Sequence, residues 1–227
     1  MIIGDLFAGV GGMSEGFRMA GFDVAFAIEY DKDIAASYKK NHTDTDVIAD
    51  DICNVDVVLL HQKHPHIDVI IGGPPCQGFS QKGKRLSLGD PRNFLFKQFV
   101  KFVAEFKPKY FVLENVPNII TTSNGYFKDQ IIKSFEELGY VVTCGVLCAK
   151  DYGVPQDRRR AIFLGELNKL EVNYLNLLIF RLRLRMPFTI YLSLHREKVL
   201  MSVIMINLQY LLIKRNFVRV RKSFIII

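Results

Sequence analysis

Short apolar runs alternate with amphipathic stretches along the first 165 residues. Apolar runs bounded by polar or glycine-rich turns predict buried strands at residues 1–6, 23–29, 46–49, 67–71, 110–113, 140–147 and 160–164. Apolar residues spaced three and four apart predict helices at residues 13–20, 31–41, 93–106 and 126–138. Strands that alternate with helices in this way are typical of an α/β fold with a doubly wound, mostly parallel, Rossmann-like sheet.

Residues able to do chemistry follow several of the predicted strands. A glycine-rich turn follows the first strand, and later strand ends carry Glu29, Asp51, the Pro75-Cys76 pair and Glu114. Ligands of such sheets bind outside the carboxyl ends of the strands. We therefore expect these residues to form a single site at that edge.

The turn Gly9-Val10-Gly11-Gly12, with Glu29 twenty residues after Gly9, is typical of a nucleoside cofactor site. Glycines let the ligand approach the main chain, and an acid at the end of the second strand can accept both hydroxyls of a ribose. An ordinary strand-to-helix turn is the alternative. The spacing does not separate a dinucleotide from S-adenosylmethionine, but Phe7 favours the latter because its ring can face an adenine.

A cysteine lies in the stiff loop Gly72-Gly73-Pro74-Pro75-Cys76-Gln77-Gly78-Phe79-Ser80. The prolines restrict the backbone and the glycines leave room for a substrate. A thiolate at such a position can attack electrophilic carbon. The alternative is a buried, inert cysteine, but a position at a strand end favours the nucleophile. The other three cysteines are interpreted as structural, and no metal site is expected.

Three charged residues complete the candidate site. Glu114 ends the fifth strand, where partial burial favours a carboxyl that holds its proton; a helix-capping carboxylate is the alternative. Arg158 and Arg160 share one face of an extended segment, and two guanidinium groups can hold a phosphate or a polar base edge. A solvated basic turn is the alternative for the arginines.

Four motifs, in this order and spacing, resemble the cytosine-C5 DNA methyltransferase family. They are residues 5–12, 73–80, 114–116 and 156–160, so the resemblance covers residues 1 to about 165. It implies S-adenosyl-L-methionine as cofactor, bound by Phe7, Ala8, Gly9, Gly11, Gly12, Glu29, Asp51, Ile52 and Pro75. It implies Cys76 as the nucleophile and Glu114 as the acid at cytosine N3, with Arg158 and Arg160 steadying the flipped base and the catalytic loop.

The residue types agree with that chemistry. Addition of a thiolate at cytosine C6, assisted by a carboxyl at N3, turns C5 into a carbon that can accept a methyl group. The base must leave the helical stack to reach a loop cysteine. Double-stranded DNA is the expected substrate; RNA is a more distant alternative, because the motifs do not identify the polynucleotide.

Composition changes after Gly165. Residues 1–165 hold 19 Lys+Arg and 20 Asp+Glu, whereas residues 166–227 hold 11 and 3, with no Gly, Ala, Asp or Cys. The net charge of +7 is therefore a property of the tail, not a DNA footprint on the first part. The family's recognition region and Asn-rich return segment are not recognisable. We expect a partial catalytic domain at 1–165, a sheet lacking its return strand or helix, and an atypical basic Leu/Ile-rich tail at 166–227.

Several hypotheses account for this tail. It is a DNA-contacting extension, a basic amphipathic segment, or the product of a frame change near residues 164–170, which we favour because Gly, Ala and Asp vanish together. We expect the chain alone to be weakly active or inactive, with a second chain supplying recognition; a non-catalytic cofactor-binding remnant is the alternative. The absence of a leader, the few cysteines and an apolar run too short to span a bilayer predict a cytoplasmic location without membrane association.

Overall fold

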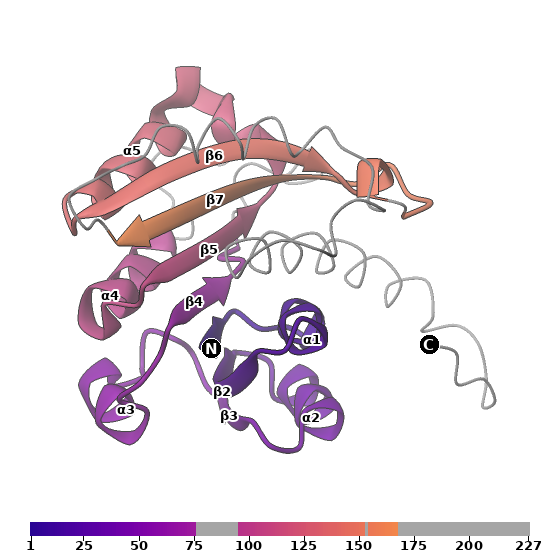
Figure 1. Cartoon of the computed structure of the whole chain (residues 1–227), viewed down its shortest axis with the longest axis vertical. Helices are drawn as coiled ribbons and strands as arrows, with labels where there is room; N and C mark the ends of the chain where they lie inside the picture. Colours follow the sequence, from indigo (N-terminus) through magenta and orange to yellow (C-terminus); the bar gives the residue numbers. More distant parts are fainter. Residues whose placement is uncertain (76–94, 153, 168–227) are drawn as a thin grey trace.

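The computed structural model describes residues 1–75, 95–152 and 154–167, which form a seven-stranded sheet with helices on both faces (Figure 1). The strand order is β3-β2-β1-β4-β5-β7-β6. The strands are β1 (Ile2–Leu6), β2 (Asp23–Glu29), β3 (Asp46–Ala49), β4 (Val69–Gly72), β5 (Tyr110–Asn115), β6 (Tyr140–Cys148) and β7 (Arg159–Leu167). The predicted doubly wound, mostly parallel sheet is confirmed.

The last strand pairs differently from the others. Strands β1 to β5 pair in parallel, whereas β7 lies antiparallel between β5 and β6. β7 contains the strand predicted at residues 160–164, and the expected loss of the family's later return segment stays a prediction, because residues after 167 lie outside the described part of the chain. The predicted atypical tail lies outside the described residues from 168 onward.

Helices cover the sheet from both sides. They are α1 (Gly12–Met19), α2 (Lys32–Asn41), α3 (Val57–Lys63), α4 (Phe96–Phe106) and α5 (Tyr126–Glu136), with short 3₁₀ turns η3 (Pro117–Ile120), η4 (Thr122–Gly125) and η5 (Ala149–Tyr152). Figure 1 shows α1 and α2 on one face and α3, α4 and α5 on the other. None of the described helices is long and apolar enough to cross a membrane.

The larger core cluster lies between the sheet and α3, α4 and α5. In α4, buried aromatic rings recur at the spacing of one helix face, and they pack on the same sheet face as Phe111. Phe111 of β5 stacks on Phe135 of α5 with ring centroids 3.9 Å apart. Burial of each such side chain contributes about 2–3 kcal/mol relative to exposure, so this face rigidly fixes β4 and β5.

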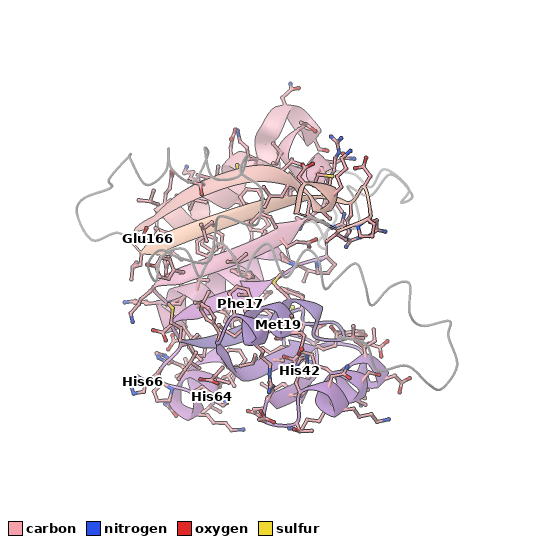
Figure 2. All side chains as sticks on the ribbon, turned by 45° about the vertical axis from the view of Figure 1, so that its right-hand side comes forward. Phe17, Met19, His42, His64, His66 and Glu166 are labelled. Carbon is pink, nitrogen blue, oxygen red and sulfur yellow. The ribbon has the colours of Figure 1, made fainter. Side chains whose placement is uncertain are left out.

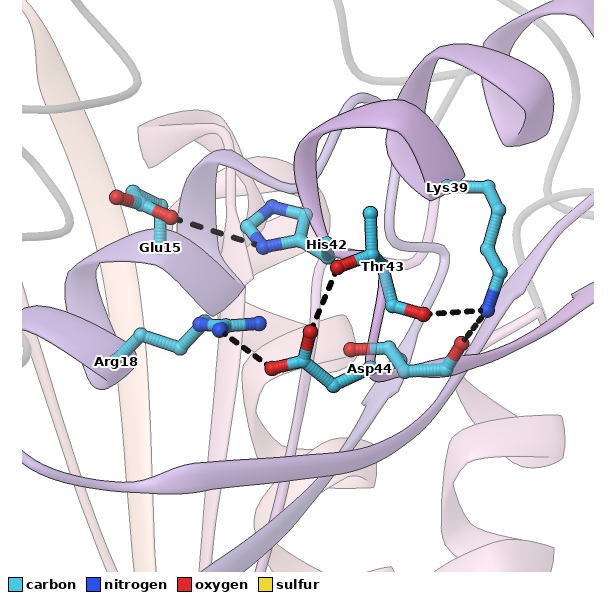
Figure 3. A network of polar contacts seen from close by, with 7 residues as sticks. Glu15, Arg18, Lys39, His42, Thr43 and Asp44 are labelled. Atoms are coloured by element: carbon cyan, nitrogen blue, oxygen red, sulfur yellow. Dashed lines mark hydrogen bonds and ion pairs between the residues drawn. The ribbon is translucent and has the colours of Figure 1, made fainter.

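The opposite face holds a smaller cluster around Phe17 of α1, which is buried against β1 and β4, whereas Met19 on the same helix is exposed (Figure 2). Polar contacts then tie α1 to the loop between α2 and β3 (Figure 3). Arg18 pairs with Asp44 at 2.9 Å, and the Lys39 ammonium donates to the carbonyls of Thr43 and Thr45 at 3.0 and 2.6 Å. Together these contacts fix α1 and α2 as one layer over β1 to β3.

Candidate active site at the carboxyl edge of the sheet

Three strands end together where the strand order reverses direction. Leu6 of β1 lies opposite Gly72 of β4, and Gly72 lies opposite Leu113 of β5. From these ends the chain continues as the turn of residues 7–12, named here the glycine turn, as the segment of residues 73–75, and as Glu114. The topological switch point of such a sheet is where ligands bind. The predicted convergence of these three motifs is thus observed.

The glycine turn has an unusual backbone. Phe7, Gly9 and Gly11 have φ angles of 58°, 59° and 86°, in the left-handed region. That region costs a phenylalanine on the order of 1–3 kcal/mol, so the surrounding structure must hold it there. The Gly11 amide donates to the Ala8 carbonyl at 3.0 Å, and the Ala8 amide donates to Ile28 at 3.0 Å. The turn is therefore anchored to β2.

Glu29 lies where the sequence places it, beside the glycine turn. One carboxylate oxygen accepts from the Gly9 amide at 2.7 Å, and the other accepts from the Asp31 amide at 2.9 Å. Each oxygen keeps a second lone pair, which a ribose hydroxyl can use. Sequence reasoning missed Tyr30, which follows directly and is 73% exposed. An aromatic residue directly after a strand-ending acid is the sequence signal that could have found it.

Asp51 and Ile52 follow β3, the next strand along. Asp51 is half-buried and accepts from the Cys53 amide at 2.8 Å. The Ile52 side chain is buried in the larger core cluster. Cys53 is exposed as a residue, but partial loss of water around its thiol raises the thiol pKa, and the neighbouring Asp51 carboxylate raises it further. That thiol is therefore a poor nucleophile.

Gly11 is needed because buried rings lie directly beneath it. A Cβ at this position would lie 2.8 Å from Cε2 of Tyr38 and closer still to His42. We expect Gly11→Ala to lower the free energy of unfolding by about 2–4 kcal/mol, measured by urea denaturation. Gly21→Ala is the matched control, since Gly21 has a φ of 84° with nothing within 4 Å, and it should cost about 1 kcal/mol. Equal losses in the two variants would contradict the close packing under the turn.

Glu114 near the end of β5 and Arg160 near the start of β7 form an ion pair. Arg160 Nε lies 2.5 Å from Glu114 Oε1, and each side chain is 17% exposed. The other carboxylate oxygen would lie 2.9 Å from a Cβ at Gly73, so only glycine leaves room for it there. The Asn115 side-chain amide donates to the Pro74 carbonyl at 2.9 Å. The segment that leads to Cys76 is therefore fastened to β5 beside Glu114.

Arg159 and Arg160, the first two residues of β7, contact different carboxylates, as expected for neighbours on an extended segment. Arg160 points to Glu114, whereas Arg159 lies 3.5 Å from Asp157. Hydrogen bonds from the Cys148 thiol and then from Lys150 lower the pKa of Asp157, which keeps it ionised. Arg158 is half-buried, and its carbonyl accepts from the Ala149 amide at 2.8 Å, which closes the loop between β6 and β7.

Cys76 lies outside the described residues, so its role stays a prediction, while Pro75 immediately before it is exposed. Within the described ranges, no group of three His, Cys, Asp or Glu side chains is arranged to hold a metal ion.

Comparison with known proteins gives the family. The family model for C-5 cytosine-specific DNA methylase matches residues 1–203. Type II methyltransferase M1.HphI of Haemophilus parahaemolyticus is 44% identical over 174 residues, 75% of this chain and 47% of that protein. Type II methyltransferase M.AquIA of Picosynechococcus sp. is 42% identical over 172 residues, 70% of this chain and 69% of that protein.

A solved structure shares the fold. A variant of Spodoptera frugiperda DNMT2 has a TM-score of 0.62 at 24% identity, covering 76% of this chain and 51% of that one. The chain spans less than half the length of the first curated relatives, 47% of M1.HphI and 40% of M.DdeI. The family match nonetheless covers most of the chain, and the sheet brings the described motifs to one edge. The chain therefore belongs to the C-5 cytosine-specific DNA methylase family, whose members use S-adenosylmethionine.

Proposed function

We propose that this chain is the catalytic part of a DNA (cytosine-5)-methyltransferase that acts on a flipped cytosine through a covalent adduct with Cys76. The observation that carries the proposal is the Glu114–Arg160 pair, which lies against Gly73 at the switch point of the sheet. An ion pair at that edge is costly unless it is used or well satisfied. The pair lies at the end of β5, and only β4 separates β5 from β1, which leads into the glycine turn, so substrate and cofactor groups would meet at this edge.

The glycine turn fits S-adenosylmethionine. A Cβ at Gly9 would meet no atom within 4 Å, so space lies open above the turn, and the Glu29 carboxylate borders it. Glu29 would take the ribose hydroxyls, and Phe7 and Tyr30 offer rings to the adenine. Ala8, Gly11, Gly12, Asp51, Ile52 and Pro75 complete the proposed binding set. When bound, the cofactor supplies a methyl group on a positively charged sulfur.

The chain's own residues would carry the remaining steps. The Cys76 thiolate forms a bond to cytosine C6, and the electron pair of the C5–C6 double bond moves toward C5 and N3. N3 takes up a proton from solvent, relayed by the Glu114 carboxylate, which also accepts from the exocyclic amine, while Arg160 holds this carboxylate in place. After C5 gains the methyl group, solvent takes the C5 proton, the thiolate leaves C6, and N3 returns its proton by way of Glu114, which restores the aromatic ring.

A companion chain is part of the proposal. M.AquIA and M1.HphI align with this chain over 172 and 174 residues. These alignments cover 69% of M.AquIA but only 47% of M1.HphI, so M.AquIA is the shorter protein. A methyltransferase chain close to this length therefore exists among the relatives. We propose that a second chain supplies target recognition in the cytoplasm, and that a frame change explains the tail. Nucleotide sequence downstream that encodes no recognition region in any frame would refute the frame change.

Methyl transfer tests the proposed substrate. The isolated chain, incubated with tritiated S-adenosylmethionine and cytosine-containing duplex DNA, is expected to transfer label slowly to DNA and not to RNA of the same sequence. Duplex DNA with 5-methylcytosine at every cytosine is the control and should accept none. Label on RNA instead of DNA would overturn the DNA assignment, and fast transfer by the isolated chain would overturn the need for a second chain.

A further inference from the structure

A buried carboxyl lies beneath the glycine turn, in an otherwise apolar strand. Asp5 is 1% exposed and faces α1 and α2, on the side where Ile3 packs against Phe17. The Ser14 hydroxyl donates to Asp5 Oδ2 at 2.6 Å, and the Tyr38 hydroxyl donates to Ser14 Oγ at 2.6 Å. The proposed methyl transfer makes no use of this chain of hydrogen bonds.

The chain of hydrogen bonds reaches the cofactor turn from below. Ser14 lies in the first turn of α1, whose N-cap is Gly11. The Tyr38 ring packs under that same Gly11. Asp5 therefore links the end of β1, the start of α1 and the packing beneath the turn. A change at Asp5 acts on the turn through these two contacts.

The pKa of Asp5 lies near neutral pH. Burial raises its pKa from 3.8 to about 7; hydrogen bonds from Ser14 oppose the rise, and the negative charge of Glu29 adds to it. The carboxyl thus changes charge near neutral pH, while the turn above it is held by Glu29. The neighbouring strand β4 is Val-Ile-Ile-Gly and contributes no charge.

Other charged groups lie farther along the same layer. His42, after α2, packs on the Tyr38 ring with centroids 4.5 Å apart, and its Nδ1 lies 3.6 Å from Glu15 of α1. Arg18 of α1 pairs with the exposed Asp44. The hydrogen bond from Ser14 is the contact through which α1 reaches the Asp5 carboxyl.

We propose that Asp5 is a positioning residue of the glycine turn, and that its ionised form makes the site prefer S-adenosylmethionine over S-adenosylhomocysteine. The two ligands differ by one methyl group and by the positive charge on sulfur, which the product lacks. A buried carboxylate under the turn attracts that charge through a medium of low polarity. The inference rests on the proposed function, because it requires the cofactor to occupy this turn.

The direction of the hydrogen bonds is a second reason why the position of the glycine turn should depend on the ionisation of Asp5. Tyr38 donates to Ser14 and Ser14 donates to Asp5, so the chain ends on an acceptor. A protonated carboxyl must place its own hydrogen, which competes with the Ser14 donor. Protonation of Asp5 therefore removes the charge and also loosens the link that positions α1 under the turn.

Equilibrium binding tests the proposal. Dissociation constants for S-adenosylmethionine and S-adenosylhomocysteine are measured by calorimetry with the full chain at about pH 6 and about pH 8. The preference for S-adenosylmethionine is expected to rise roughly threefold to tenfold toward the higher pH. Asp5→Asn should abolish this rise. The control Asp44→Asn removes an equal charge from the exposed surface of the same layer and should keep it.

A second variant separates positioning from simple stability. Ser14→Ala keeps the Asp5 charge but removes a hydrogen bond that favours it, so the pH at which the preference changes should move upward. A merely structural role would weaken both ligands equally without moving that pH. A preference that does not vary with pH, or that varies equally in Asp5→Asn, would overturn the inference alone. Failure of the chain to bind either ligand would instead refute the proposed cofactor site.

Discussion

Glu114→Gln is expected to lower the free energy of unfolding by about 2–3 kcal/mol, because it leaves the Arg160 guanidinium beside a neutral amide. Both side chains are largely removed from solvent, so water can solvate the unpaired Arg160 guanidinium only in part. Gln has nearly the same shape as Glu, which confines the effect to charge. Urea unfolding at neutral pH measures the loss.

A double-mutant cycle isolates the pair. Arg160→Gln alone should also destabilise the chain, whereas Glu114→Gln with Arg160→Gln should cost less than the sum of the two. Lys109→Gln is the control, because Lys109 forms a comparable 2.8 Å ion pair with Asp68 but is 71% exposed, and should change stability by under about 1 kcal/mol. Strictly additive losses at 114 and 160 would show that the two charges do not depend on each other.

The apolar pattern predicted the strands and the mostly parallel sheet, but not the position of the last strand in that sheet. The apolar run at residues 160–164 predicts a strand, yet nothing local to those residues says that it extends over residues 159–167 or that it inserts antiparallel between β5 and β6. Helix α3 was missed because Val57 and the three apolar residues after it form an unbroken run without helical spacing. Its one local signal was Asp56, whose carboxylate accepts from the Val58 and Leu59 amides and caps the helix.

The site was predictable where its residues lie on neighbouring strand ends. Gly9 and Glu29 follow β1 and end β2, which pair directly, so their contact follows from the fold class. Asp5 was missed as a functional group because its partners Ser14 and Tyr38 come from two different helices. Only tertiary packing brings those side chains under the turn. Long-range contacts of this kind leave no periodic trace in the sequence.

Cys76→Ser is expected to abolish covalent capture of duplex DNA that carries 5-fluorocytosine in place of cytosine. Fluorine at C5 cannot leave as a proton does, so an adduct between the cysteine and C6 persists after methyl transfer and survives denaturing electrophoresis. A serine hydroxyl stays protonated near neutral pH and is far less nucleophilic than a thiolate. The wild-type chain should form the adduct slowly, over long incubation with S-adenosylmethionine, and the variant should form none.

Cys53→Ser distinguishes this reaction from any other exposed thiol. Cys53 is exposed as a residue, but partial loss of water around its thiol and then the Asp51 carboxylate raise the thiol pKa, so its thiolate is scarce. The variant should therefore form the adduct as the wild type does. Capture lost in Cys53→Ser and kept in Cys76→Ser would reverse the assignment of the nucleophile. A wild-type chain that binds S-adenosylmethionine yet captures no DNA would instead fit a cofactor-binding remnant, because the glycine turn and Glu29 lie at the ends of β1 and β2, whereas Cys76 comes after β4.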